Sequence, residues 1–465
     1  MFSALYLLAL PFALFAYLWT MRRKRNILLP PSPPSEPILG HLRTFPRIDQ
    51  DQAFYELSKV YGDVMHFNVL GKSVIILSST EAATDLLDKR SANYSDRPAF
   101  PAFELLGWGR TLVFTPYGSS FHVQRKLLTQ PFTRQGCAVF QPIQLQQAHM
   151  LLQNLVHSPE DYESHIRRYT AAIIMQITYG HRVQSDDDRY VKLAEQVNDT
   201  ILAMGRATIL DLLPFLKHLP PWFPGAWFIR YARDTQPMRD EMENEPFEEV
   251  RRQMTWGTIL IFIFAILLHP EAQKRAQREI EEVIGSSRLP DFDDRDSLPY
   301  LECLLQESRR WHPTISLGVP HRSMADDVYR GMFIPKGATI IANARALSLD
   351  ENVYPNPHLF WPERFLPENG QPHPTSAMFG FGRRVCAGKN LADASVWIVA
   401  ATILASFDIT MVKDEHGKDL PPKVEFTRGL TSVVSEEGEQ LPCTAILALN
   451  LDLQIAHANT TWSIE

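Results

Sequence analysis

The sequence predicts a mainly α-helical protein with a smaller β region. Apolar residues recur at helical spacing through most of residues 80–284. Strand and turn signals gather instead in residues 37–77 and 328–342. The chain has 465 residues, 45% of them hydrophobic, so it can bury a large core. Length alone would divide such a chain into about two or three domains.

The N-terminal segment, residues 1–25, is predicted to be a transmembrane anchor. Residues 2–21 carry no charge and match the length of a spanning helix. The basic run at residues 22–25 follows at once, which places the rest of the chain on the cytoplasmic side. A cleaved signal peptide is the alternative, although its charges would precede the apolar run. Residues 26–36 are rich in proline and predict a stiff hinge.

The remaining elements follow in order along the chain. Residues 37–77 should alternate short strands with a helix, and residues 74–77 should form a buried strand. A long helical region comes next, and strand and turn signals return at residues 328–337 and 339–342. Near the C-terminus, helical spacing predicts one more helix directly after Cys386, on Leu391, Ala394, Ile398 and Ala401.

Charge changes abruptly at the junction between Met254 and Thr255. Charged residues dominate the segment that ends at Gln253, whereas residues 254–268 carry none. The charge-free stretch from Thr255 to Leu268 should be helical, because the pattern of residues 80–284 is mainly helical. At 1.5 Å per residue such a helix is only about 20 Å long, too short to cross a bilayer.

Cys386 lies in the most informative stretch of the chain, residues 379–388. Gly382 and Gly388 lack a Cβ, so the backbone on either side of the cysteine is expected to turn sharply and to approach a flat macrocycle. Arg384 could neutralise a propionate. A thiol just before a helix N-terminus is readily ionised, and a thiolate bound axially to heme iron favours O–O cleavage. The alternative is a buried structural cysteine in a glycine-rich turn.

This stretch resembles the F-x-x-G-x-R-x-C-x-G signature of the cytochrome P-450 family. The fixed positions are occupied by Phe379, Gly382, Arg384, Cys386 and Gly388. Three charged residues further upstream are similar to the family's K-helix and downstream arginine positions, where they form a buried network that holds the heme loop; they are Glu307, Arg310 and Arg364.

Two further segments resemble family contacts to the heme propionates. Residues 117–126 are similar to the family's C helix, with Phe121 where tryptophan is commoner and Arg125 four residues later. Phenylalanine lacks the indole N–H, so this contact would rest on Arg125. His321 matches another frequent propionate partner, and its alternative is a surface histidine on a strand.

The resemblance implies a single cytochrome P-450 domain over residues 37–432 that is incomplete around the I helix. The family's A-G-x-[D/E]-T segment is missing before the Met254/Thr255 junction, either as a true variant or through splicing or gene-model error. Thr255 would stand at or beside the catalytic alcohol without an acidic neighbour, and its alternative is a helix-interior threonine near the junction. Residues 433–465 form an atypical tail.

The implied function is monooxygenation of an apolar small molecule, in the manner of the fungal secondary-metabolism branch. Heme b would be the cofactor, with Cys386 as its axial thiolate and metal ligand, and a flavin-containing, NADPH-dependent reductase would supply electrons. The resemblance also implies an endoplasmic-reticulum membrane location. Two alternatives are a heme-thiolate isomerase or dehydratase and a truncated, inactive relative. The net charge of −7 argues against nucleic acid as a partner, and the four cysteines show no zinc spacing.

Overall fold

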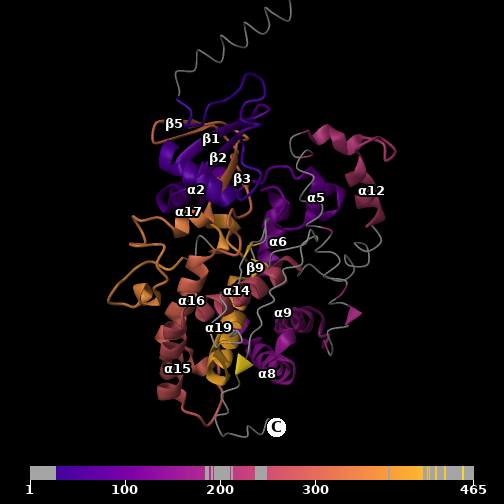
Figure 1. Cartoon of the computed structure of the whole chain (residues 1–465). Coiled ribbons are helices and arrows are strands. Elements are labelled where there is room, and N and C mark those ends of the chain that lie inside the picture. Colours follow the sequence, from indigo (N-terminus) through magenta and orange to yellow (C-terminus); the bar gives the residue numbers. More distant parts are fainter. Residues whose placement is uncertain are drawn as a thin grey trace, which may run out of the picture.

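A computed structural model describes residues 28–183, 188–189, 192, 200, 210, 213–235, 249–374, 378–411, 416 and 418, and the strand residues 425–426, 434–435 and 453–454. The predicted anchor, residues 1–25, lies outside these residues, as does most of the 433–465 tail. Helices make up most of the described chain, and a small sheet lies at one end of them, as predicted (Figure 1).

The main sheet has four strands in the order β1-β2-β6-β3. Strands β1 (Val64–Val69) and β2 (Lys72–Leu77) pair antiparallel, β2 and β6 (Thr339–Ala342) pair parallel, and β3 (His321–Arg322) joins β6 antiparallel. Ile75, Ile76 and Leu77 are fully buried, which confirms the strand predicted at residues 74–77. The sheet thereby brings residues from opposite ends of the chain together.

A separate hairpin joins β4 (Asp327–Tyr329) to β5 (Met332–Ile334). Its two turn residues, Arg330 and Gly331, both have positive φ, at 49° and 77°. This combination fits the type I′ turns that match the twist of a two-residue hairpin. The strand and turn signals of residues 328–337 are therefore confirmed.

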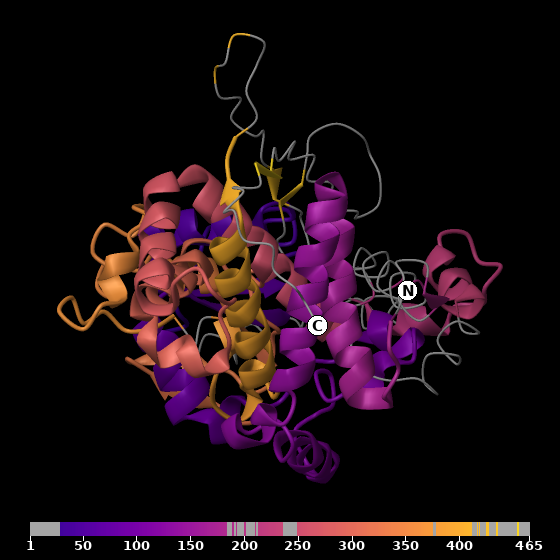
Figure 2. The same ribbon diagram turned by 90° about the horizontal axis from the view of Figure 1, so that it is seen from below.

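Six long helices form the main core. They are α8 (Gln141–His157), α9 (Tyr162–Tyr179), α14 (Glu249–Leu268), α15 (Pro270–Ile284), α16 (Pro299–Trp311) and α19 (Lys389–Ser406). Figure 2 shows α19 between α15 and α16 on one side and α8 and α9 on the other. Apolar residues on all sides of α19 are buried, including Trp397 at 0% exposure, so this helix is the axis of the core.

Shorter elements connect these parts. The helical ones are α2 (Gln50–Tyr61), α3 (Thr80–Ala83), the π-helix η1 (Thr84–Lys89), α4 (Ser91–Tyr94), α5 (Pro101–Leu105), η2 (Trp108–Arg110), α6 (Ser119–Thr129), α7 (Arg134–Ala138), η3 (Pro159–Asp161), η4 (Pro214–His218), α12 (Trp227–Asp234), η5 (Phe292–Ser297), α17 (Ala344–Ser348), η6 (Pro362–Phe365) and η7 (Gly382–Arg384). The remaining strands are β7 (Asp408–Ile409), β8 (Glu425–Phe426), β9 (Val434–Ser435) and β10 (Leu453–Gln454).

Helix α14 crosses the Met254/Thr255 junction without a break. It begins at Glu249 and ends at Leu268, so its 20 residues span about 30 Å and include the helix expected over residues 255–268. Four of the five helical residues 249–253 are Glu, Arg or Gln, which are good helix formers. The abrupt change in charge marks a change of composition along one helix.

Among the described residues, no single helix has both the length and the hydropathy of a membrane span. The pair Thr255–Leu268 and Pro270–Ile284, bent by 105° between its members, passes only when the two are taken together.

Candidate active site

The loop before Cys386 owes its shape to two glycines. Gly380 and Gly382 have φ values of 79° and 51°, in the left-handed region that side chains disfavour. A Cβ on Gly382 would also lie 2.5 Å from the backbone oxygen of Leu87. Gly388 has φ −88°, which any residue can adopt, so the expectation of a sharp turn at Gly388 is wrong. The turn is made before the cysteine rather than on both sides of it.

Cys386 is fixed between this turn and the start of α19. Its backbone N–H donates to the oxygen of Phe379 over 2.7 Å, which closes the loop. Gly388 is the N-cap residue of α19, so the cysteine stands just before a helix N-terminus, as predicted. The thiol is partly exposed and forms no disulfide. These features present the sulfur to the space beside the loop.

That space is a cavity, and Cys386 is one of its lining residues. Helix α14, the end of α16 with the residues that follow it, and the cysteine loop with the start of α19 enclose it. The described lining contains hydroxyls, one arginine and apolar groups but no carboxylate: Thr255, Thr258, Arg309, Thr314, Ile315, Met378, Phe379, Cys386, Gly388, Ala392 and Val396. A second cavity shares Thr255, Gly388 and Ala392 with it.

The structure places Thr255 in the wall of both cavities, where it is buried. Thr258 lies less than one turn further along α14, and its Oγ1 is 3.1 Å from Oγ1 of Thr314. Sequence reasoning missed Thr258, although its spacing of three from Thr255 puts both on one helix face. The residues of α14 that line the cavity therefore present hydroxyl groups to it.

Arg384 projects away from the loop into a buried cationic cluster, which we define as Arg97, His321 and Arg384. Its guanidinium donates to the backbone oxygens of Ser95, Leu112 and Thr115 over 2.8–3.1 Å. The ring of Phe121 lies 3.9 Å beneath the guanidinium. Burial lowers the pKa of Arg384 to about 10. Phe121 thus supports the arginine by a cation–π contact.

Arg97 is the member of the cationic cluster that sequence reasoning missed. It is also buried, and it donates only to backbone oxygens, those of Val113, Val319 and Pro320. Burial, followed by the charge of Arg384, lowers its pKa to about 9. Its neighbours in the sequence, Asp96 and Pro98, gave no signal that would set it apart from a surface arginine.

His321 is buried on β3, so it is not a surface histidine. Its Nδ1 donates to the backbone oxygen of Tyr94 over 2.6 Å, which leaves Nε2 to face other partners. Burial and then the charge of Arg97 lower the pKa of His321 to about 3. Arg125 on α6 is half-buried, and its charge acts to lower the pKa of Arg384.

The cationic cluster has the chemistry of an anion site. Within the described residues, neither Arg97 nor Arg384 forms an ion pair with a carboxylate, and Asp96 is engaged by Arg322 and by the backbone N–H of Tyr117. Burying a charge without a partner is costly, so the fold favours a bound anion here. Heme propionates fit this requirement, and the cavity beside the cysteine loop presents a thiol and apolar groups suited to an iron porphyrin.

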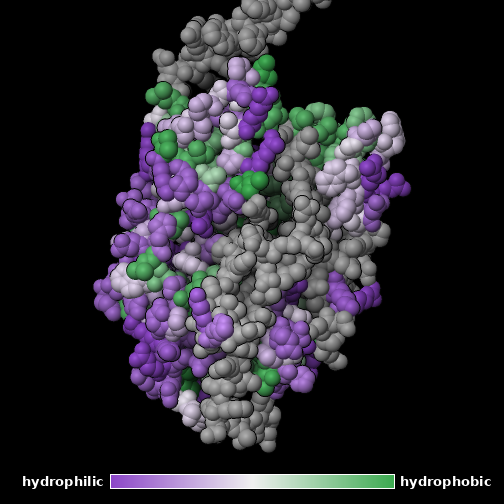
Figure 3. Space-filling model, viewed as in Figure 1, coloured by the Kyte–Doolittle hydropathy of each residue, from purple (hydrophilic) through white to green (hydrophobic). Residues whose placement is uncertain are grey.

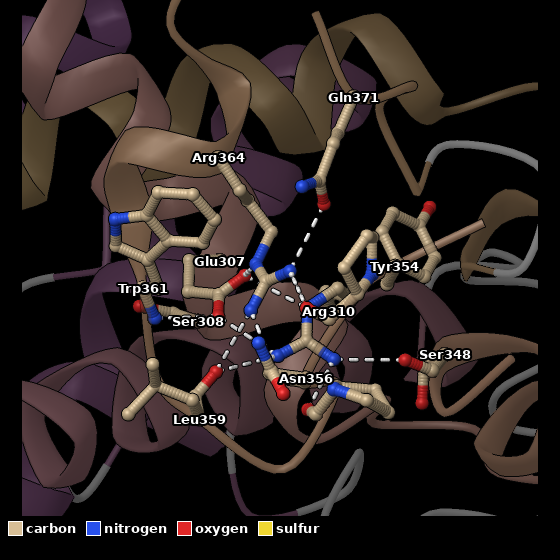
Figure 4. A network of polar contacts seen from close by, with 12 residues as sticks. Glu307, Ser308, Arg310, Ser348, Tyr354, Asn356, Leu359, Trp361, Arg364 and Gln371 are labelled. Carbon is tan, nitrogen blue, oxygen red and sulfur yellow. Dashed lines mark hydrogen bonds and ion pairs between the residues drawn. The ribbon is translucent and has the colours of Figure 1, made fainter. Parts of the chain in front are cut away.

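A second set of buried charges, the Glu307 network, is complete within the chain (Figure 4). Glu307 pairs with Arg310 at 2.8 Å and with Arg364 at 3.1 Å, and all three side chains are fully buried. Glu307 also accepts the backbone N–H of Trp361. Further donors of Arg310 and Arg364 reach backbone oxygens of the segment 348–359. The structure thus brings together the three residues that the sequence resemblance grouped.

Comparison with known proteins agrees with this geometry. The family model of cytochrome P450 matches residues 30–243 and 255–433. The chain belongs to the cytochrome P450 family. A cytochrome P450 monooxygenase 176 of Postia placenta is 35% identical, over 91% of this chain and 91% of its own length. A cytochrome P450 monooxygenase of Armillaria gallica is 34% identical over 90% and 93%, and ple1 of Rhodocybe pseudopiperita is 35% identical over 90% and 90%.

These relatives confirm the resemblance to fungal cytochrome P450 enzymes and make the chain an oxidoreductase of the monooxygenase type. Membership implies a heme-thiolate cofactor and electrons from a redox partner. The family match is interrupted between residues 243 and 255, directly before Thr255. The missing I-helix segment stays a prediction, because the break in the match does not say what the segment contained.

Proposed function

We propose that this cytochrome P450 inserts one oxygen atom of O₂ into an apolar small molecule, with Cys386 as the axial ligand of heme b. The observation that carries the proposal is the shared cavity, in which the partly exposed thiol of Cys386 and the hydroxyls of α14 line the same space. Cys303 and Cys137 are buried elsewhere, and burial raises the pKa of Cys303 to about 12, so that thiol stays protonated.

The cationic cluster would hold the propionates. Arg384 and Arg97 offer guanidinium groups that are anchored by backbone oxygens, His321 offers Nε2, and Arg125 adds positive charge from α6. Gly382 and Phe379 shape the loop beside the macrocycle. Charge-assisted hydrogen bonds of this kind fix both the position and the orientation of an anionic group.

When bound, heme b would supply the activation of O₂, which consumes two electrons and two protons, places one oxygen atom in the substrate and releases the other as water. Protons must pass through groups of this chain or through water that they hold. Thr255 and Thr258 can relay a proton through their hydroxyls, but the described lining has no carboxylate to supply it. We therefore expect slow proton delivery and a partial loss of electrons as hydrogen peroxide.

An apolar substrate is supported by the side chains near the cavity. The described lining of the cavity includes five apolar side chains: Ile315, Met378, Phe379, Ala392 and Val396. Such a wall selects by shape and hydrophobicity. A role in fungal secondary metabolism would fit this preference.

Electrons would come from a flavin-containing, NADPH-dependent reductase. The surface beside the cysteine loop carries Lys126 and Arg383, both exposed, and the half-buried Arg125 and Lys389. An acidic partner surface would approach such a group faster than a neutral one, especially at low salt.

We further propose an endoplasmic-reticulum location with a single N-terminal anchor at residues 1–25. Apolar side chains are exposed beside the start of the described chain and near α12, including Leu28 at 78%, Ile38 at 88% and Trp222 at 78% (Figure 3). Such residues would rest against a membrane surface more favourably than in water. Deletion of residues 1–25 should release the protein from membranes while heme binding persists, and persistent pelleting would contradict a single anchor.

The lining without a carboxylate also favours a second candidate, a heme-thiolate isomerase or dehydratase that rearranges a peroxide without external electrons. Such a reaction needs no delivered protons for O₂ cleavage. It would proceed at the same rate with and without the reductase, which separates it from monooxygenation. A chain that binds no heme at all would instead be the inactive relative.

The test measures NADPH consumption, hydrogen peroxide and product together, with the full-length chain, a fungal reductase and 7-ethoxycoumarin as an apolar probe. We expect reductase-dependent NADPH consumption, much of it as peroxide, and product formation about 10²–10⁴-fold slower than in a relative with an intact acid–alcohol pair. Thr255→Val should raise the peroxide fraction further. Thr402→Val is the matched control, because Thr402 is buried on α19 and bonds only to its own helix. Tightly coupled turnover by the unaltered chain would contradict the proposed proton delivery.

A further inference from the structure

Arg309 is a buried charge that neither the Glu307 network nor the cationic cluster uses. It lies on α16 between two members of the E-x-x-R motif, yet its side chain turns to the other side, where only 3% of it is exposed. It lines the same cavity as Cys386. Burying an arginine costs free energy, so its place in the wall of the proposed heme site suggests a role there.

Arg309 is held by a carboxylate from the helix that follows the cysteine loop. Its Nη1 donates to Oδ1 of Asp393 over 2.6 Å. Asp393 lies on α19, less than two turns after Cys386. Burial acts to raise the pKa of Asp393, but the charges of Arg309 and Arg295 outweigh it and lower the pKa to about 2. Asp393 is therefore ionised at every working pH.

Arg309 and Arg295 share the carboxylate of Asp393, and Glu302 is a second carboxylate that pairs with Arg295. Arg295 donates to Oδ2 of Asp393 over 2.6 Å and to Oε2 of Glu302 over 2.8 Å. Meanwhile the Nε of Arg309 is buried and has no hydrogen-bond partner among the described residues. The Arg309 guanidinium is thus tied at one edge and unsatisfied at another, in the wall of the cavity.

We propose that Arg309, positioned by Asp393, raises the reduction potential of the heme held by Cys386. This inference rests on the proposed function, because it requires heme in the cavity. Adding one electron makes the heme site more negative, and a nearby buried cation stabilises that state more than the oxidised one, since charges interact strongly at low dielectric constant. Asp393 is the positioning residue, and the positive charge of Arg309 acts on the iron through its electric field.

The test is a redox titration of the full-length, heme-loaded chain and its variants. Arg309→Leu removes the cation, and we expect at least a tenfold fall in the equilibrium constant for one-electron reduction, a shift of about 59 mV to lower potential. Arg309→Lys keeps the charge and should retain most of the original potential, even if thermal unfolding shows that it loses stability. Asp393→Asn removes the opposing charge and should raise the potential.

Arg278→Leu is the matched control, because Arg278 is exposed on α15 and donates only to the backbone of its own helix. Its potential should equal that of the unaltered chain. Equal shifts in Arg309→Leu and Arg309→Lys would overturn the proposal, since a purely structural role predicts that result. If Arg309→Leu takes up no heme, the polar but uncharged Arg309→Gln decides, and an unchanged potential there overturns the proposal.

A different measurement tests the proposed function. The reduced carbon monoxide complex of the unaltered chain should show the thiolate-type spectrum before any potential is measured. Its absence would count against Cys386 ligation and heme binding, whereas its presence with the wrong pattern of potentials would count against Arg309 alone.

Discussion

The Glu307 network and the cationic cluster are both buried groups of arginines, but they differ in how their charge is balanced. In the Glu307 network one carboxylate faces Arg310 and Arg364, and the chain supplies every partner. In the cationic cluster Arg97 and Arg384 are anchored by backbone oxygens alone. A balanced group stabilises the fold by itself, whereas an unbalanced group costs free energy until an anion binds.

The balance of charge therefore distinguishes buried charges that stabilise the fold from buried charges that bind a ligand. Breaking a balanced buried pair leaves one ion without a partner, which is severely destabilising. Removing one member of an unbalanced group relieves a desolvation cost that the folded chain already bears. Variants of the two regions should therefore respond in different ways, and the difference can be measured with and without heme.

The largest effect is expected in the Glu307 network. Glu307→Gln should lower the free energy of unfolding by about 3–5 kcal/mol, because Arg310 and Arg364 would share a neutral amide in a fully buried site. Denaturant unfolding followed by circular dichroism measures the loss. Glu56→Gln is the matched control, since Glu56 is also paired three residues away, with Lys59, but on the surface, and it should change little. Equal losses of stability in the two variants would show that the buried Glu307 network stabilises the fold no more than a surface ion pair does.

A smaller effect, and on a different quantity, is expected in the cationic cluster. Arg384→Met should weaken heme binding about 10- to 100-fold, because a hydrogen bond to a charged group contributes about 1.5–3 kcal/mol. The heme-free protein should lose much less stability than Glu307→Gln does, since relief of desolvation offsets the lost hydrogen bonds.

Heme transfer to apomyoglobin measures the affinity of the Arg384→Met variant, and Arg383→Met provides the exposed neighbour as a control. Unchanged affinity in Arg384→Met would show that the propionates lie elsewhere.

The smallest effect concerns acid. The pKa of His321 is lowered by burial from 6.5 to about 3, so the unfolded chain takes up a proton as the pH falls below 6.5 while the folded chain does not. The folded state therefore loses stability on acidification, by about 2 kcal/mol at pH 5 for this one group. His321→Gln should remove that part of the acid sensitivity in the heme-free protein, and the exposed His358→Gln should not.

The free energy of unfolding, measured at pH 7.5 and at pH 5, shows whether acidification destabilises the folded chain as expected. Bound heme should shrink the difference between His321→Gln and the unaltered chain, because propionate charge favours protonated His321 and raises its pKa. The same acid sensitivity in both proteins would contradict the burial of a neutral histidine.

Much of the site was predictable because its signals are local in sequence. The cysteine loop places Gly382, Arg384 and Cys386 within a few residues, and the structure retains the predicted turn and the helix that follows. The pairing of Glu307 with Arg310 follows from their spacing on one helix face. The strand at residues 74–77 was legible from its apolar run.

Other features depend on contacts between distant segments and could not be predicted. Arg97 joins the site only because backbone oxygens of residues 113, 319 and 320 converge on it. Arg309 looks like a solvated member of α16 until α19 brings Asp393 against it.

The most direct test of the account is the spectrum of the reduced carbon monoxide complex of the full-length chain and of two cysteine variants. We expect a thiolate-type spectrum for the unaltered chain and its complete loss in Cys386→Ala. The spectrum should persist in Cys303→Ala, because the thiol of Cys303 is buried outside the cavity. An unchanged thiolate-type spectrum in Cys386→Ala would contradict the assignment of the axial ligand and, with it, the site built around the cysteine loop.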